Sequence, residues 1–356
     1  MFTLQAGKNI TAKDIKDIAT ELHPYKCYGG NGVRGFVASY NREGDFPIIG
    51  RQGALCGNIN IAKGKFYATE HAVVVERYCD VDLMWTYYTL TALNLNQYAT
   101  ATAQPGLSVA VINDVCIPIP PQKEQERISK EMERWFAFID QIEQSKADLQ
   151  TAIKQAKSKI LDLAIHGKLI PQDPNDEPAI ELLKRINPDF TPCDNGHSGK
   201  LPQGWCYCNY KDVFSDVPSK AYQILQSDIQ NDGKYPVISQ SVNYIEGYTN
   251  TNNVFQHKIP CIIFGDHTRN VKYVDFDFVV GADGVKILCP KVNVKWSFYM
   301  IMYASSHIEN KGYSRHFGQI IKFSYKLPPI AEQQRIVQKI GELFSVLDNI
   351  QKALEV

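Results

Sequence analysis

The chain has 356 residues, 44% of them hydrophobic, and its 38 basic side chains balance 38 acidic ones. This length predicts two domains, each with enough apolar residues for a core of its own. Zero net charge argues against a protein that binds nucleic acid by electrostatic attraction alone, and no apolar run is long enough to span a membrane. We expect no membrane association and a cytoplasmic location, where the nine cysteines, which form no CxxC pair, are reduced thiols.

Residues 1–120 are typical of an α+β globular domain. Short β-type runs alternate with Gly, Asn and Asp, and a short apolar helix follows at 84–90. A Gly-containing loop at 104–107 and a last strand then lead to Pro120-Pro121. The predicted strands are Tyr25–Tyr28, Phe46–Gly50, Phe66–Tyr67 and Ala72–Glu76.

Residues Gly30–Gly35 have the spacing GxGxxG, which in a dinucleotide site joins a strand to a helix. The following residues, Phe36–Asn41, carry no helix signature, and no strand ending in an acidic residue lies about 20 residues further on. We therefore interpret this run as a Gly-rich loop that brings the backbone close to another group.

A long helix is predicted over 121–166. Proline can open a helix but cannot lie inside one, and Glu124 lies in the first turn, where the helix dipole favours an acid. Apolar residues then recur at alternating spacings of four and three, which is typical of a coiled-coil seam. Such a helix would be roughly 70 Å long at about 1.5 Å per residue, so it needs a second helix as its partner.

The second half of the chain repeats this organisation. Residues 327–350 align with 119–142 without a gap, and both copies contain Pro-Pro-x-x-Glu-Gln-x-Arg-Ile. The domain before the second copy, 200–329, has its own short helix at 295–301 and a Gly-containing loop at 315–318. Its predicted strands are Tyr235–Ser239, Ile259–Gly265, Val271–Val274 and Val285–Leu288.

The repeats differ in extent. Residues 167–199 predict a linker with one short helix, Ala179–Ile186, and the second long helix, 330–356, is shorter than the first. The first domain has no counterpart of the segment around Trp205, so we expect it to be shortened at its N-terminal end.

The sequence thus predicts an α+β protein with an internal pseudo-twofold repeat, in which two globular domains alternate with two long helices. The helices are expected to pair as an antiparallel coiled coil, although each could instead pack on its own domain. The residues expected to form the pairing are Ile128, Met132, Trp135, Ile139 and Ile142 in the first helix and Ile336, Ile340, Leu343, Leu347 and Ile350 in the second.

No arrangement of residues predicts catalysis or a metal site. The chain has no Walker A sequence, no HExxH and no Asn/Asp-Pro-Pro-Tyr, and Asp266-His267 beside Arg269 fits a surface loop better than a catalytic group. The loops are instead rich in side chains that can bond base edges and phosphates, although polar loops without a ligand would look the same. The candidate DNA-binding residues are Tyr28, Gly29, Gly30, Asn31, Arg34, Arg51, Gln52 and Gln104 in the first domain and Ser239, Gln240, Ser241, His267, Thr268, Arg269, Asn270, Lys272, Arg315 and His316 in the second.

These features together resemble the specificity subunit of a type I restriction–modification system. The resemblance rests on the two Pro-Pro helix starts and on four phrases in a fixed order along the chain. The phrases are Tyr28–Gly32, Ile49–Gly53, Ala68–Ala72 and Ile165–Pro174. The resemblance implies two target-recognition domains, each reading one half of a bipartite site in double-stranded DNA, with the helices setting the gap.

The resemblance also implies partners. Two modification subunits would dock on the helices, bind S-adenosylmethionine and methylate adenine, and a motor–nuclease restriction subunit would join them. This chain would bind no cofactor and catalyse nothing itself. Two alternatives stay open: a DNA-recognition module that serves another catalytic partner, such as a single-chain nuclease–methyltransferase, and a coiled-coil scaffold without DNA binding.

Overall fold

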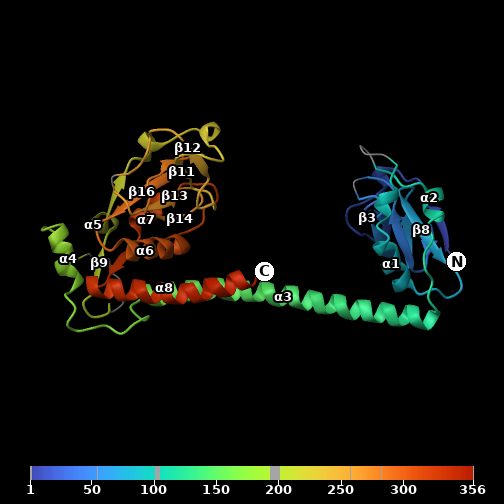
Figure 1. Cartoon of the computed structure of the whole chain (residues 1–356), viewed down its shortest axis with the longest axis horizontal. Helices are drawn as coiled ribbons and strands as arrows, with labels where there is room; N and C mark the ends of the chain where they lie inside the picture. Colours follow the sequence, from blue (N-terminus) through green and yellow to red (C-terminus); the bar gives the residue numbers. More distant parts are fainter. Residues whose placement is uncertain are drawn as a thin grey trace. The chain divides into compact units, whose positions relative to one another are not determined.

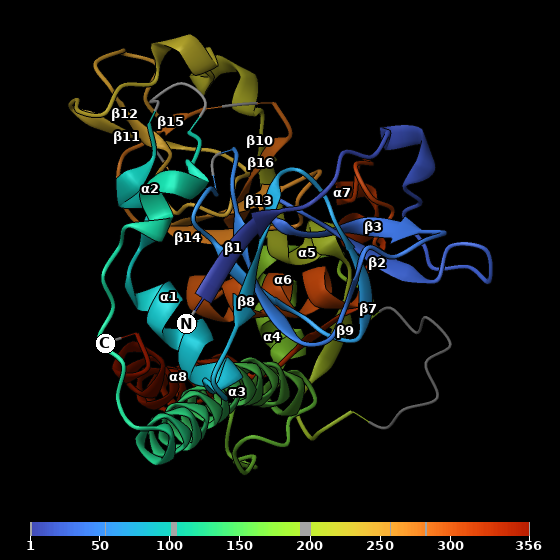
Figure 2. The ribbon, with the colours of Figure 1, turned by 90° about the vertical axis from the view of Figure 1, so that its right-hand side faces the viewer.

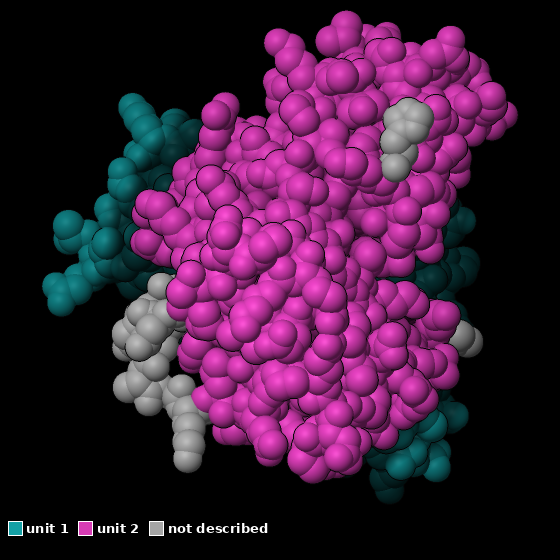
Figure 3. Space-filling view, turned by 90° about the vertical axis from the view of Figure 1, so that its left-hand side faces the viewer, with its two compact units in different colours: residues 1–144 teal, residues 145–356 magenta. Residues whose placement is uncertain are grey.

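The computed structural model describes residues 2–53, 55–100, 105–192, 201–256, 258–281 and 283–355. They form two compact units, Met1–Gln144 (unit 1) and Ser145–Val356 (unit 2), which Figure 3 colours separately. The boundary lies inside helix α3 (Gln122–Ile165), which is one residue shorter at each end than the predicted 121–166. Across the described ranges, no helix has the length and apolar character needed to cross a membrane.

Unit 1 contains two four-stranded sheets, ordered β1-β8-β5-β6 and β3-β2-β7-β4 (Figures 1 and 2). Its strands are β1 (Phe2–Ala6), β2 (Tyr25–Gly29), β3 (Gly32–Val37), β4 (Arg42–Glu43), β5 (Phe46–Gly50), β6 (Ile59–Ala62), β7 (Lys65–Ala68) and β8 (Ala72–Arg77). Its short helices are η1 (Ala12–Asp14), α1 (Leu83–Ala92), η2 (Leu95–Tyr98) and α2 (Val109–Asn113). The β-branched run of β8 is buried on both faces, because Val73 and Val75 belong to one core and Val74 to another.

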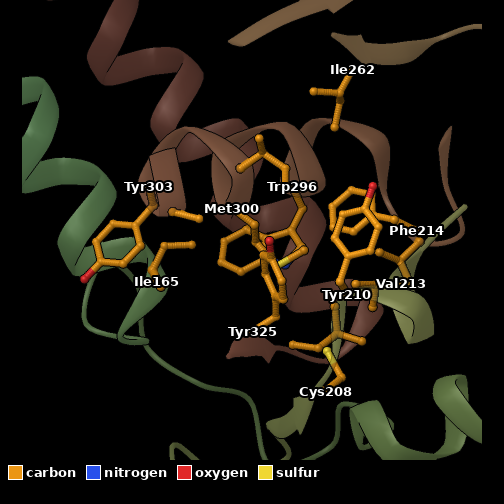
Figure 4. Close-up of a cluster of buried hydrophobic side chains, with 14 of the residues drawn as sticks. Ile165, Cys208, Tyr210, Val213, Phe214, Ile262, Trp296, Met300, Tyr303 and Tyr325 are labelled. Atoms are coloured by element: carbon orange, nitrogen blue, oxygen red, sulfur yellow. The ribbon is translucent and has the colours of Figure 1, made fainter. Parts of the chain in front are cut away.

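Unit 2 contains sheets ordered β10-β16-β13-β14, β12-β11-β15 and β17-β9. Its strands are β9 (Cys206–Cys208), β10 (Phe214–Val217), β11 (Tyr235–Ile238), β12 (Gly247–Thr249), β13 (Cys261–Gly265), β14 (Val271–Val274), β15 (Val279–Val280), β16 (Val285–Pro290) and β17 (Tyr325–Leu327). Its helices are α4 (Ala179–Ile186), α5 (Tyr210–Val213), η3 (Ser219–Tyr222), η4 (Gln226–Asp228), α6 (Val294–His307), α7 (Phe317–Lys322) and α8 (Ile330–Ala353). Figure 4 shows its main core, in which Trp296 and Met300 of α6 lie with Tyr325 and with Tyr210 and Phe214.

The two units repeat one pattern of strand pairing. Strand β2 pairs in parallel with β7, and β11 pairs in parallel with β15, whereas the other pairs between the named strands of the described residues are antiparallel. In unit 1 Gly50 pairs with Ala72, and in unit 2 Gly265 pairs with Val285. The predicted α+β fold with an internal repeat is therefore confirmed, with a long helix in the middle of the chain and another near its end.

A buried glutamine from the repeated motif fixes each long helix to its own globular domain. Gln125 donates from Nε2 to the Pro120 carbonyl at 2.8 Å and accepts at Oε1 from the backbone N–H of Asp82, the N-cap of α1, at 2.9 Å. Gln333 does the same with Pro328, at 2.8 Å, and with Asn293, the N-cap of α6, at 3.3 Å. Because both amides are buried, these bonds satisfy groups that water cannot reach.

Substitution of this glutamine by an apolar residue should therefore destabilise unit 2. We expect Gln333→Leu to lower the free energy of unfolding by about 1–3 kcal/mol, since two backbone groups lose their partner in a buried site. Urea denaturation of the full chain measures this change. The neighbouring variant Gln334→Leu is the control, because Gln334 is exposed; equal stability of the two variants would contradict the role given to the buried amide.

The predicted helix pairing is correct for only part of the seam. In unit 2, Ile336 and Ile340 of α8 are fully buried, Leu343 and Leu347 are half-buried, and α8 lies along the C-terminal part of α3 (Figure 1). An ion pair from Lys157 to Asp348, 2.5 Å, links these two helices.

The other half of the seam is not paired. Ile350 is 40% exposed, Ile128, Trp135, Ile139 and Ile142 of α3 are 37–52% exposed, and Met132 is half-buried. The prediction fails at the α3 positions because α8 has 24 residues against the 44 of α3.

Three other expectations need correction. The last strand before the Pro-Pro pair forms only in unit 2, as β17, and residues 117–119 of unit 1 lie outside any strand. Residues 167–192 are not a free linker, because Leu183 and Phe190 are buried in the core of unit 2. The loop expected at 315–318 is shorter, since Phe317 and Gly318 begin α7.

The glutamate of the repeated motif is buried only in unit 2. Glu332 accepts hydrogen bonds from Trp205 Nε1 at 3.0 Å and from Gln172 Nε2 at 3.3 Å. Burial raises the pKa of the Glu332 carboxyl, against the opposing effect of these hydrogen bonds and of Arg335. Its counterpart in unit 1, Glu124, is exposed.

This difference predicts a pH dependence. Because the pKa of Glu332 is raised above 4.5, the folded state binds more protons than the unfolded state just above that pH. The contribution of Glu332 to stability therefore falls as the pH rises through the range from 4.5 to the folded-state pKa. Glu332→Gln should remove this fall in denaturation curves recorded across that range, and Glu124→Gln should leave it in place. Identical pH profiles for the wild type and Glu332→Gln would refute the assignment.

Candidate nucleic-acid interface

The candidate residues of unit 1 gather around one hollow of about 490 Å³. It lies where the turn between β2 and β3 meets the residues that follow β5. Of the predicted residues, those that line it are Gly29, Gly30, Asn31, Arg34 and Gln52. Segments about 20 residues apart in the sequence thus form one surface, and the side chains of Asn31, Arg34 and Gln52 are exposed on it.

Glycine is required here because two backbones touch. A Cβ on Gly50 would lie 1.9 Å from the Gly30 carbonyl oxygen, and a Cβ on Gly30 would lie 2.6 Å from that of Gln52. Gly29 pairs with Gly32 across a two-residue turn, so the GxGxxG run is a β-hairpin. It does not form the strand-to-helix turn of a dinucleotide site, and the backbone that it approaches is that of β5 and its extension.

Two predicted residues of unit 1 support this surface from behind. Arg51 is half-buried and donates from Nε to the Leu107 carbonyl at 3.1 Å, which joins the loop before α2 to the end of β5. Tyr28 is buried, with its hydroxyl 3.4 Å from the Ile61 carbonyl, so its prediction as a DNA contact is wrong. Gln104 lies outside the described residues.

Sequence reasoning missed His71, which also lines the hollow. Its Nε2 lies 3.2 Å from Glu70 Oε1, and its Nδ1 is buried with no hydrogen-bond partner among the described residues. The phrase Ala68–Ala72 contains it, but no spacing rule marks a single histidine as a ligand contact.

In unit 2 the matching loops are joined by Gln240. Its backbone carbonyl accepts from Thr268 Oγ1 at 2.6 Å and from Asn270 Nδ2 at 2.9 Å. Its side chain accepts from the His267 N–H at 3.1 Å and donates to the Asp283 carbonyl at 2.9 Å. The loops after β11 and β13 therefore form one rigid surface, as the corresponding loops do in unit 1.

Buried side chains hold this surface in place. Lys272 is 5% exposed and donates from Nζ to the Ser239 and Asn243 carbonyls, the first at 2.8 Å. The Ser239 and Ser241 hydroxyls both donate to Glu246. Lys272 and Ser239 are thus scaffold residues, and their prediction as DNA contacts is wrong.

His316 also has a structural role. It is fully buried, its N–H donates to the Asp266 carbonyl at 2.8 Å, and its Nε2 accepts from the Lys311 N–H at 3.2 Å. Asp266 Oδ1 in turn accepts from the Phe317 N–H at 2.8 Å, at the start of α7. The prediction of His316 as a DNA contact is therefore wrong, and Asp266 stabilises a helix start.

The charges inside the scaffold perturb one another. Hydrogen bonds from Ser241 and Ser239 and the charge of Lys272 lower the pKa of Glu246, with the Ser241 bond the largest cause and burial opposing them. Burial lowers the pKa of the Lys272 ammonium, and the charge of Glu246 opposes that change. The bonds of Lys272 to the Ser239 carbonyl and of Ser239 and Ser241 to Glu246 hold the loop that carries Gln240.

The groups that remain accessible in unit 2 are fewer than predicted. Thr268 and Arg315 are exposed, and Arg269 is half-buried at a φ of 63°, with Nη1 3.5 Å from the Ile308 carbonyl. Sequence reasoning missed Tyr313, which is 85% exposed and stacks on His267 with ring centroids 4.6 Å apart. An exposed aromatic ring beside Arg315 is suited to contact nucleic acid, but a single tyrosine in a polar run gives no sequence signal.

If Lys272 is a scaffold residue, replacing it should lower the stability of unit 2, whereas replacing the exposed Arg315 should not. Lys272→Met should lower the stability of unit 2 by about 1–3 kcal/mol, because two carbonyls and Glu246 lose a buried partner. Arg315→Met, at an exposed position, should change it by less than about 0.5 kcal/mol. Thermal unfolding of the two variants measures this difference. A Lys272→Met protein that is fully stable yet defective in DNA binding would restore Lys272 as a contact.

Within the described part of the chain, no group of three or more His, Cys, Asp or Glu side chains is placed to hold a metal ion. What the geometry provides is a polar loop edge in each unit, carried on a sheet and bordered by exposed Asn31, Arg34 and Gln52 in unit 1 and by exposed Thr268, Tyr313 and Arg315 in unit 2. Such side chains bind the edges of bases and the phosphates between them.

Comparison with known proteins agrees with this geometry. The model of the type I restriction modification DNA specificity domain matches the chain twice, at residues 27–151 and 202–356. The chain therefore belongs to this family of DNA specificity domains. Each match contains one set of the loops described above.

Individual relatives are specificity subunits. The chain is 42% identical over 139 residues to the EcoprrI specificity subunit of Escherichia coli, a match that covers 39% of this chain and 35% of that protein. It is 23% identical over 355 residues to the putative S.HindORF215P subunit of Haemophilus influenzae, covering 93% and 82%. The chain thus matches about a third of the first relative and four fifths of the second.

A solved structure shares the fold. It comes from work on complex assembly and conformational transition of the type I restriction–modification system, and it aligns at a TM-score of 0.60 with 14% identity, covering 99% of this chain and 93% of that one.

Proposed function

We propose that this protein selects the DNA sequence on which a type I restriction–modification complex acts, and that each unit reads one half of a bipartite site. The observation that carries the proposal is the coincidence of the two family matches with the two polar loop edges. The accessible side chains of each edge would read bases, while other basic side chains fix register on phosphates.

The two edges are built alike but differ in chemistry. The exposed side chains are Asn31, Arg34 and Gln52 in unit 1 and Thr268, Tyr313 and Arg315 in unit 2. A common scaffold with different loop residues is what two domains that read different half-sites require. This pattern supports the proposal over a scaffold protein that does not bind DNA.

The proposed partner subunits follow from the role of this chain in a type I restriction–modification complex. We propose that two modification subunits dock on α3 and α8, bind S-adenosylmethionine and methylate adenine, and that a motor–nuclease subunit joins them for restriction. In this proposal the chain is a non-catalytic subunit, and the two helices set the gap between the half-sites.

Substitutions on the two edges test the reading of half-sites. In the complex with its modification subunits, Arg34→Ala should weaken binding to the cognate site by about 1–3 kcal/mol and relax discrimination only in the half read by unit 1. Arg315→Ala should do so only in the other half. Competition binding with DNA substituted in one half-site at a time measures both effects.

Lys63→Ala is the control, because it removes an exposed positive charge of unit 1 at the end of the β5–β6 pair opposite to Gly50. A uniform loss of affinity for all sequences would mean that the two arginines contact phosphates. Unchanged binding for both variants would contradict the assignment of these edges as the DNA-reading surface.

A further inference from the structure

Unit 1 exposes a face whose counterpart in unit 2 is covered. We call it the open face and define it by Ile117, Ile119, Glu124 and an adjacent apolar hollow of about 340 Å³. The hollow is bordered by Phe2 of β1 and by Leu93 after α1, as well as by the two isoleucines. Ile119 is 40% exposed, and residues 117–119 pair with no strand in the described ranges.

The ungapped repeat identifies the matching residues of unit 2. Tyr325, Leu327 and Glu332 stand where unit 1 has Ile117, Ile119 and Glu124. All three are buried, at 2% exposure or less. The same backbone path is therefore open to solvent in one unit and covered in the other.

The segment Trp205–Tyr210 covers this face in unit 2, and Gln172 adds a further bond to Glu332. Cys206 and Cys208 of β9 pair with Leu327 and Tyr325 in an antiparallel ladder, and both cysteines are buried. Trp205 Nε1 donates to Glu332 Oε2 at 3.0 Å.

Tyr210, the last residue of this segment, lies where the hollow is in unit 1. Its ring stacks on Phe214 at 4.9 Å and lies 6.4 Å from that of Tyr325 (Figure 4). Phe214 pairs with Pro290 of β16 as Phe2 pairs with Arg77 of β8, so Phe214 and Phe2 are counterparts. Two neighbours of Tyr210 thus correspond to two residues, Phe2 and Ile117, that border the hollow.

We propose that the open face of unit 1 binds a segment of a second polypeptide that has the pattern of Trp205–Tyr210. The segment would add as an antiparallel strand to residues 117–119, which is recognition by β-strand addition. Its tryptophan would donate to Glu124, its small residues would face the two isoleucines, and its last aromatic ring would fill the hollow.

We assign the occupant to a second polypeptide, since the copy of the pattern in the described residues of this chain is already in use. Within unit 2 that copy is buried, paired with β17 and bonded to Glu332. Unit 1 would gain from such a partner, since an exposed isoleucine beside an apolar hollow forms a patch that proteins ordinarily cover.

A synthetic peptide tests the proposal on the full chain. The probe is a fluorescein-labelled peptide with the sequence of residues 201–214, carrying Cys206→Ala and Cys208→Ala to prevent oxidation. We expect saturable binding by fluorescence anisotropy at micromolar concentrations. A peptide that also carries Trp205→Ala and Tyr210→Ala should bind at least about tenfold more weakly, since aromatic anchors contribute most of the affinity of such contacts.

Variants of the chain locate the site. Ile119→Glu places a charge beside the hollow and should weaken binding of the probe at least about tenfold. Leu22→Glu makes the same change at a position of unit 1 that is 78% exposed and should have no effect. Both positions are exposed enough for the variants to fold, which circular dichroism verifies. No saturable binding up to about 1 mM, or equal binding to the wild type and Ile119→Glu, would overturn the proposal.

Discussion

The architecture of each unit depends on one buried amide. Gln125 and Gln333 join a proline carbonyl at the start of a long helix to the N-cap of the short helix that packs on the sheet. A buried amide that loses either partner leaves polar groups unsatisfied, so the direction in which the long helix leaves its domain is fixed by hydrogen bonds as well as by packing. The fixed pair of prolines before it limits the helix to one starting point.

The same sheets that receive this helix carry the candidate interface at another edge. In unit 1 the contact between Gly30 and Gly50 holds the hairpin against β5, and in unit 2 Gln240 and Lys272 perform that task with side chains. Each unit thus has a rigid scaffold with variable surface groups. This division lets the exposed groups differ between the two units while the scaffold stays alike.

Much of the fold could be predicted from the sequence, because the internal repeat aligns without gaps and the helix seam is periodic. The bounds of β5, β14 and α4 agree with the prediction to the residue. The site was harder to predict, because polarity alone does not separate a DNA contact from a buried scaffold residue. Lys272 and His316 are polar residues like Arg315, but only the three-dimensional structure shows that they are buried. The exposed half of the α3 seam was missed although the sequence predicts a shorter second helix, because the apolar spacing continues over residues that the structure leaves exposed.

The central claim is that this chain determines which DNA sequence is modified. The most direct measurement is genome-wide adenine methylation in cells with and without the gene, with the modification subunits present in both. The account predicts that one bipartite methylated motif disappears when the gene is absent and returns when it is restored. An unchanged methylation pattern, in cells where the chain co-purifies with its modification subunits, would contradict it.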